Sequence, residues 1–157
     1  MRATWDQTWI TVATAVSKRS QCVNRQVGAV IVDEGNRPIA VGYNGPPANM
    51  ATSGPCSGFC PRGGSQNRTG SYENCVSVHA EANALLFADR RLFQAATIYV
   101  TNPCCWDCAK LIANSGISRV VMCRSAADKH ASWDKVIDLF KECNIKVETN
   151  EREENAI

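Results

Sequence analysis

Apolar residues recur at helical spacing near the start of the chain. The apolar positions that share one helix face are Trp9, Val12, Ala13 and Val16. The preceding segment, residues 4–7, reads Thr-Trp-Asp-Gln and has the form of a capping box, in which the first and last side chains bond each other's backbone N–H. This pattern predicts an amphipathic helix that begins near residue 4 and ends near Arg19.

The pattern then changes to that of a β-hairpin. Residues 27–33 are mostly apolar and β-branched, and they end at a turn signal, Glu34-Gly35-Asn36. Residues 38–43 fit the returning strand. The following stretch, residues 44–76, is rich in Gly, Pro, Ser and Asn, so we expect a long loop there.

Helical and strand patterns alternate over the rest of the chain. We expect helices at 78–90, 105–115 and 132–142, and strands at 96–101, 119–123 and 144–148. Ser77 is the expected cap of the first of these helices, with Ala82, Leu85 and Leu86 facing the core, and Gly116 is the expected stop of the second. This order predicts an α/β fold, a three-layer α/β/α sandwich with a mixed sheet of roughly five strands. One domain is expected over residues 1–149, followed by a polar tail at 150–157.

Composition narrows the class of protein. The chain has 157 residues, 45% of them apolar, which suits one domain with a substantial core. Its net charge of +2 and its scattered basic residues do not predict a nucleic-acid partner. No run of about 18 apolar residues predicts a membrane helix, and no signal peptide is recognisable at the N-terminus. We therefore expect a cytoplasmic protein with no membrane partner.

Cysteine is unusually frequent. Nine cysteines are present, an odd number, without an export signal. In a reducing compartment disulfides are disfavoured, so this count predicts metal binding instead.

Two short motifs place metal-binding side chains at helix starts. Cys105 and Cys108 are three residues apart and so share a helix face, and His79 lies at the start of another predicted helix. Two thiolates and one imidazole are the ligand set of a catalytic zinc site that leaves one position open for water. Glu81 follows His79 by two residues and would take a proton from the activated water and pass it to a leaving amino group. This combination resembles the His-x-Glu and Pro-Cys-x-x-Cys signature of zinc deaminases.

The second motif departs from that signature in one position. Pro103 comes one residue early, and Cys104 stands where the signature has proline. Counting back from Cys108 and forward from Thr101 favours Cys105 as the first ligand. A Cys104–Cys108 pair, four residues apart, would also share a helix face and stays open as an alternative.

Most of the chain resembles the deoxycytidylate deaminase family of the cytidine-deaminase-like fold. The matching stretches are residues 17–20 (Ser-Lys-Arg-Ser), 27–30 (Val-Gly-Ala-Val), 42–45 (Gly-Tyr-Asn-Gly), 79–84 (His-Ala-Glu-Ala-Asn-Ala), 99–101 (Tyr-Val-Thr), 108–110 (Cys-Ala-Lys) and 115–117 (Ser-Gly-Ile). The resemblance implies zinc-dependent hydrolysis of dCMP to dUMP, with Glu81 as the catalytic residue. It also implies a homo-oligomer, often a hexamer, with dCTP and dTTP as effectors.

The resemblance further implies contacts with the substrate. Asn44 would bond the deoxyribose or the base edge, Asn24 and Arg25 would lie near the phosphate, and Ala80 would line the site. Arg25 also fits a solvated surface charge, and Asn44 also fits a simple turn residue.

A second, structural zinc occurs in several members of the family. Its ligands here would be Cys22, Cys56, Cys60 and Cys75, the last three from the long loop. The alternative is that these are reduced, partly buried thiols.

Three other functions remain open from the sequence. The first is a deaminase of another substrate, such as dCTP, a modified dCMP or a free base. The second is a nucleic-acid editing deaminase, although the basic and aromatic residues that grip a strand are sparse. The third is a zinc-stabilised binding module without catalysis, against which the presence of Glu81 argues.

Overall fold

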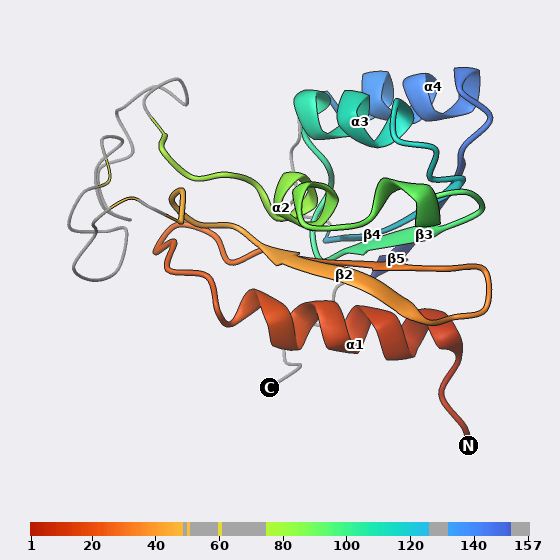
Figure 1. Cartoon of the computed structure of the whole chain (residues 1–157), viewed down its shortest axis with the longest axis horizontal. Helices are drawn as coiled ribbons and strands as arrows, with labels where there is room; N and C mark the ends of the chain where they lie inside the picture. Colours follow the sequence, from red (N-terminus) through yellow and green to blue (C-terminus); the bar gives the residue numbers. More distant parts are fainter. Residues whose placement is uncertain (49, 51–59, 61–74, 126–131, 152–157) are drawn as a thin grey trace.

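The computed structural model describes residues 1–48, 50, 60, 75–125 and 132–151. Its elements are, in order, α1 (Trp5–Ser17), β1 (Gly28–Val32), β2 (Pro38–Tyr43), α2 (Ala80–Leu86), the 3-10 helix η3 (Arg90–Leu92), β3 (Thr97–Val100), α3 (Trp106–Ala113), β4 (Arg119–Arg124), α4 (Trp133–Glu142) and β5 (Lys146–Glu151). The strands form one mixed sheet in the order β2-β1-β3-β4-β5. β1 is antiparallel to β2 and β3, whereas β3, β4 and β5 are parallel. The predicted α/β/α sandwich is confirmed (Figure 1).

The first helix covers one face of the sheet. Thr4 caps α1 through the predicted capping box, in which its hydroxyl accepts from the Gln7 N–H and the Gln7 side chain accepts in return. Trp9 and Ala13 are buried against the sheet side chains of Val30, Val32, Tyr99 and Val121. Gly28 permits this contact, because a Cβ there would lie 1.9 Å from the Ala13 carbonyl oxygen. The helix and the hairpin are therefore joined by close backbone approach as well as by apolar packing.

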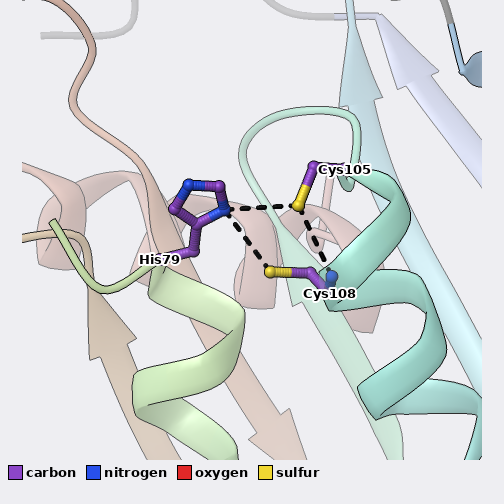
Figure 2. Close-up of side chains that lie close together, drawn as sticks. All are labelled: His79, Cys105 and Cys108. Carbon is purple, nitrogen blue, oxygen red and sulfur yellow. Dashed lines mark hydrogen bonds between the residues drawn. The ribbon is translucent and has the colours of Figure 1, made fainter. Parts of the chain in front are cut away.

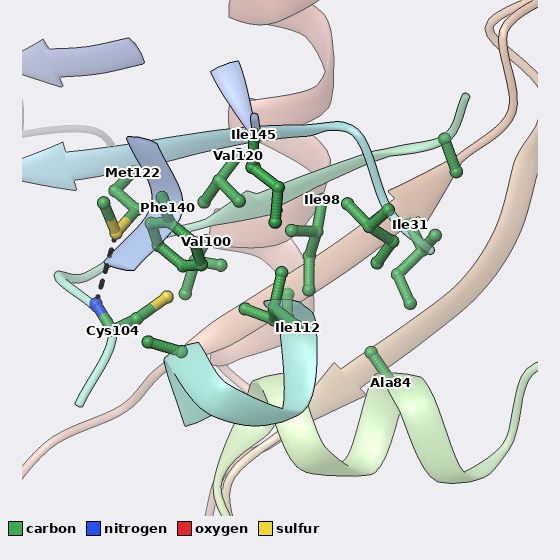
Figure 3. Close-up of a cluster of buried hydrophobic side chains, with 14 of the residues drawn as sticks. Ile31, Ala84, Ile98, Val100, Cys104, Ile112, Val120, Met122, Phe140 and Ile145 are labelled. Carbon is green, nitrogen blue, oxygen red and sulfur yellow. Dashed lines mark hydrogen bonds between the residues drawn. The ribbon is translucent and has the colours of Figure 1, made fainter. Parts of the chain in front are cut away.

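The larger core lies on the opposite face, under α2, α3 and α4 (Figure 3). Alternate residues of the central strands point into it, including Ile31, Ile98, Val100, Val120 and Met122. The helices contribute Ala84 from α2, Ile112 from α3, and Val136 and Phe140 from α4. The small residues on α2 bring this helix close to the sheet, whereas the larger side chains on α3 and α4 fill the wider space.

Several predicted boundaries were wrong, and the end of the second helix is one of them, since α2 ends at Leu86 and not at residue 90. We predicted a helix over 78–90 capped by Ser77, but α2 begins at Ala80 with His79 as its N-cap. The reason is tertiary: Val78 forms a two-way backbone bridge with Gly45, which keeps the chain extended up to His79. β5 also runs on to Glu151, past the expected start of the tail, because it pairs with β4 along its whole length.

The predicted inward direction of Leu86 was also wrong, since its side chain is 72% exposed. Ala80 and Ala84 are four residues apart and define the buried face of α2. Leu86 follows Ala80 by six residues and so projects from the other side of the helix. Within the residues that the structure describes, no helix is long and apolar enough to cross a membrane.

Candidate metal centre

One edge of the sheet gathers the ends of several elements. The start of β1, the end of β2 and the end of β3 meet there, because β1 is antiparallel to both neighbours. The end of β4 joins them because β3 and β4 are parallel. The Gly45–Val78 bridge brings the start of α2 to this edge, and residues 101–105 lead from β3 into the start of α3. We call this the metal edge.

Three electron-pair donors converge at the metal edge (Figure 2). His79 Nδ1 lies 3.3 Å from Cys105 Sγ and 3.5 Å from Cys108 Sγ, and all three donor atoms lie within 4.8 Å of one another. A tetrahedral zinc with ordinary Zn–S and Zn–N bonds places such ligands about 3.6 Å apart. Over the described residues this is the one His/Cys/Asp/Glu group of three or more found close enough to hold a metal. The donor set and its spacing fit zinc.

Local helix geometry presets both sulfur atoms. Cys105 is the N-cap of α3 with extended backbone, and its Sγ accepts a hydrogen bond from the Cys108 backbone N–H at 3.4 Å. Cys108 follows by one helical turn, so its side chain lies on the same face. The positive end of the helix dipole favours thiolates at these positions.

The side chains of the adjacent residues Cys104 and Cys105 point in different directions. Cys105 joins the His79 cluster, whereas Cys104 is 1% exposed and packs in the larger core (Figure 3). The structure thus brings together the ligand set that register counting favours, and the alternative pair with Cys104 is not among the groups it forms within the described residues.

Glu81 lies on the first turn of α2 and is only 3% exposed. Burial raises the pKa of its carboxyl above the usual value, since the charged form loses its hydration. A carboxyl whose pKa is moved toward neutrality suits the transfer of a proton in both directions.

The three cluster residues are electrostatically coupled. A hydrogen bond to Cys105 raises the pKa of His79, and the nearby Glu81 carboxylate acts in the same direction. A hydrogen bond from the Cys108 thiol lowers the pKa of Cys105, and the same bond raises the pKa of Cys108. These shifts favour Cys105 as the thiolate of the pair.

Comparison with known proteins fits this site. The family model "Cytidine and deoxycytidylate deaminase zinc-binding region" matches residues 3–124. The chain belongs to this family. The family confirms the predicted fold class, the requirement for zinc and the prediction of a hydrolytic deaminase.

Several curated relatives are deoxycytidylate deaminases. The enzyme of Mycobacterium phage D29 is 45% identical over 124 residues, which cover 76% of this chain and 94% of that protein. The enzyme of Enterobacteria phage T4 is 34% identical, covering 89% and 86% respectively. The Saccharomyces cerevisiae enzyme is 43% identical, and the match spans 39% of its length.

A solved structure supports the fold. The dCMP deaminase of cyanophage S-TIM5 in its apo form superposes with a TM-score of 0.68, at 23% identity and with 96% of this chain covered. The same protein in complex with dCMP and dUMP gives a TM-score of 0.67 at 22% identity. This likeness establishes the shared architecture.

A glycine explains how this deaminase places His79 and Glu81. A Cβ at Gly42 would lie 2.2 Å from the Ala80 carbonyl oxygen and 2.5 Å from the Ala84 backbone nitrogen. The first turn of α2 therefore rests directly on the backbone of β2. Sequence reasoning treated Gly42 only as part of a family motif and missed this role, although a glycine inside a strand signals close backbone approach.

The predicted substrate residues also lie at the metal edge, but their side chains are partly engaged. Asn44 is 7% exposed; its Oδ1 accepts from the Val27 N–H and its Nδ2 donates to the Arg25 carbonyl, both at 2.8 Å. It thus holds the segment before β1 against the end of the hairpin. One Nδ2 hydrogen and one Oδ1 lone pair remain for a substrate.

The other predicted contacts differ in exposure. Arg25 is exposed, whereas Ala80 is fully buried, so only the backbone of Ala80 is available to a ligand. Asn24 is half-buried, and its Nδ2 lies 3.7 Å from Cys60 Sγ. Its Oδ1 is buried without a partner among the described residues.

The second zinc stays a prediction. Cys22, Cys60 and Cys75 are all half-buried, but among described residues they do not form a group with donor atoms within 4.8 Å. The fourth predicted ligand, Cys56, lies outside the described residues.

Proposed function

We propose that this chain hydrolyses dCMP to dUMP and ammonia. The observation that carries the proposal is the meeting of His79, Cys105 and Cys108 beside the buried carboxylate of Glu81. The phage D29 relative, which aligns over 94% of its length, supports dCMP as the substrate.

The proposed roles follow from the donor chemistry. His79 Nδ1 and the sulfur atoms of Cys105 and Cys108 would hold the zinc. When bound, zinc acts as a Lewis acid that makes water a nucleophile at neutral pH. The Glu81 carboxylate would accept a proton at one oxygen and deliver it to the departing amino group. Because Glu81 is shielded from solvent, the proton it holds is not lost to bulk water during the reaction.

The segment that Asn44 fixes would recognise the nucleotide. Asn44 binds the backbone carbonyl of Arg25, and the Arg25 side chain is exposed beside it and would bind the phosphate. Arginine suits a phosphate through its planar fork of N–H donors. A nucleoside would lack this contact, so we expect dCMP to be preferred over deoxycytidine.

Turnover tests the proposal directly. The zinc-loaded protein is incubated with dCMP, dCTP, deoxycytidine and cytosine-containing single-stranded DNA, and ammonia release is followed. We expect dCMP to give the highest kcat/KM. Faster turnover of dCTP would move the assignment to a related nucleotide, and turnover of the DNA alone would indicate an editing enzyme.

Glu81→Gln is the matched control for chemistry. It should lower kcat by about 10³-fold, because general acid–base catalysis contributes on that order. Zinc content should remain equal to that of the wild type, since Glu81 is outside the ligand group. An active Glu81→Gln variant would refute its role, and no turnover of any monomeric deoxycytidine compound would refute the function.

We also propose that the chain assembles into a homo-oligomer. Three large apolar side chains between residues 86 and 92 are exposed: Leu86 by 72%, Phe87 by 77% and Leu92 by 51%. Such exposure of apolar surface to water is unfavourable. Light scattering on the purified protein, with and without dCTP or dTTP, would test both assembly and the predicted effectors. A monomer at all concentrations would contradict the proposal.

A further inference from the structure

Arg124 is the last residue of β4 and lies at the metal edge. Its direction follows from the alternation of side chains along the strand. Val120 and Met122 point into the larger core, so Arg124, two residues after Met122, points to the same face of the sheet. Met122 Sδ accepts a hydrogen bond from the Cys104 N–H at 3.3 Å (Figure 3). The Arg124 side chain therefore leaves the sheet next to the segment that carries the metal ligands.

An aromatic ring holds the guanidinium of Arg124. Its central carbon lies 4.4 Å from the centroid of the Trp133 ring, which is within the range of a cation–π contact. Trp133 is half-buried and packs against the larger core, so the ring is itself fixed. Arg124 is an exposed residue. The contact thus keeps a solvent-accessible cation in one place at the metal edge.

This cation has no carboxylate partner among the described residues. Neither Glu151, its register partner on β5, nor Asp134, in the first turn of α4, forms an ion pair with it. Two other cations in the described part of the chain lie over an aromatic ring, Lys110 and Arg119, and each of them also pairs with a carboxylate. Arg124 therefore keeps its N–H donors available to an anion.

The neighbouring helix end also favours an anion. Trp133 is the first residue of α4, a helix of 10 residues, and helix side chains tilt toward the N-terminus. The guanidinium over its ring therefore lies near the positive end of the helix dipole, where cations are disfavoured and anions are favoured. Arginine binds phosphate groups through its planar fork of donors. The charge and the donors at this place suit a phosphate.

We propose that Arg124, held on Trp133, binds the phosphate of the substrate nucleotide. The inference rests on the proposed function. In the sheet β3 lies between β1 and β4, and it continues into the segment that carries the metal ligands. Arg25, before β1, and Arg124, at the end of β4, therefore flank this segment. Neighbouring strands are about 4.8 Å apart, so the ends of β1 and β4 are about 10 Å apart, and two long side chains can reach one phosphate.

Arg124→Gln tests the contact, because it removes the charge and keeps a polar side chain. We expect KM for dCMP to rise about tenfold, while kcat and KM for deoxycytidine stay within about twofold, since only the nucleotide offers a phosphate. Arg37→Gln is the matched control. It changes the net charge equally at an exposed arginine between β1 and β2, and it should alter neither KM. Equal KM for dCMP in Arg124→Gln and the wild type would overturn the inference.

Substitution of Trp133 tests whether its ring positions the guanidinium. Trp133→Phe keeps an aromatic face and should hold KM for dCMP within about threefold of the wild type, whereas Trp133→Leu should approach the KM of Arg124→Gln. KM for deoxycytidine should change in neither variant, and an equal rise for both substrates would contradict the positioning role. Should Trp133→Leu fail to fold, the surface variant Arg124→Gln still decides the phosphate contact.

Calorimetric titration with dUMP and deoxyuridine gives a readout without turnover. The wild type should bind dUMP more tightly than deoxyuridine, and Arg124→Gln should lose most of that difference. Equal affinity of the two proteins for dUMP would overturn the inference. An unchanged KM for dCMP together with a lost response to dCTP or dTTP would also overturn it, since the phosphate at Arg124 would then belong to an effector.

Failure of the wild type to turn over any deoxycytidine compound would instead count against the proposed function. In that case the titration still decides whether Arg124 binds a nucleotide phosphate.

Discussion

Ionisable groups with shifted pKa values lie at both ends of the strands, at the metal edge and at the opposite edge. The two sets of groups differ in the kind of partner that each group has. At the edge away from the metal ligands, Arg119 donates to Asp6 at 2.6 and 3.0 Å and to Glu148 at 2.6 Å. The Tyr99 hydroxyl donates to Asp6 at 2.7 Å. Each charge there faces an opposite charge or a hydrogen-bond partner. We call this group the Arg119 cluster.

The metal edge has the contrary arrangement. His79, Cys105 and Cys108 direct electron-pair donors at one another, and the buried Glu81 adds a further negative group. No described Lys or Arg forms an ion pair with any of them. Such a set of donors suits a bound cation, whereas the carboxylates of the Arg119 cluster already share a cation, Arg119. A shifted pKa alone therefore does not mark a functional site; the kind of partner does.

Removing a metal ligand should have the largest effect. Cys105→Ala should lower bound zinc to near zero and activity by more than about 10³-fold, because a catalytic zinc site with two protein ligands is incomplete. Metal analysis and turnover of dCMP measure the two effects. Cys123→Ala, which removes a buried thiol of β4 outside the cluster, is the control and should keep its zinc. Stoichiometric zinc in Cys105→Ala would contradict the ligand assignment.

Displacing α2 should impair the metal edge without touching a ligand. In Gly42→Ala the new methyl group would meet backbone atoms of Ala80 and Ala84, which cannot rotate away. We expect a loss of about 1–3 kcal/mol in the free energy of unfolding and a fall in kcat, because His79 and Glu81 move with α2. Chemical denaturation and turnover measure these.

Gly45→Ala is the matched control for that change. A Cβ at Gly45 meets nothing within 4 Å, so its stability should stay within about 0.5 kcal/mol of the wild type. Equal stability of the two glycine variants would show that the close approach at Gly42 is unimportant.

Breaking the Arg119 cluster should cost stability and leave the chemistry intact. Arg119→Met keeps the aliphatic stem but removes the cation shared by Asp6 and Glu148. The partners are partly exposed, so we expect a loss of about 1–2 kcal/mol in the free energy of unfolding, with kcat within about twofold. A large fall in kcat at full zinc content would mean that the two edges are coupled.

The smallest expected effect is a pH dependence. The hydrogen bond from Arg119 holds the pKa of Asp6 below its usual value in the folded protein. The carboxylate therefore stabilises the fold above its unfolded pKa, and this stabilisation is lost as the pH falls below about 4 through the folded pKa. Asp6→Asn should be less stable than the wild type at neutral pH, and the difference should shrink on acidification. Denaturation series at several pH values would show it, and a constant difference would contradict it.

Elements with a local signal were predicted well. The capping box at Thr4 placed the start of α1, and the β-branched run with its turn at residues 34–36 placed the hairpin. Gly116, at a φ of 103°, follows the end of α3 as predicted. The errors arose where a distant partner overrode a local preference. Val78 pairs with Gly45 instead of entering α2, and β4 extends β5 to Glu151.

The sequence by itself determined the chemistry of the metal edge. The three-residue spacing of Cys105 and Cys108 puts both sulfur atoms on one helix face, because residues three apart are neighbours on a helix surface. The same holds for the position of Glu81 one turn or less from His79. These relations are local and need no knowledge of the rest of the fold.

Only the tertiary structure decided how these groups meet. The approach of His79 Nδ1 to both sulfur atoms depends on two helices that join through the sheet and on the close contact at Gly42. The separate directions of Cys104 and Cys105 depend on the core beneath them, where Cys104 is buried and its N–H donates to Met122. Distances between elements are set by packing and strand register, and residue spacing along the chain does not contain them.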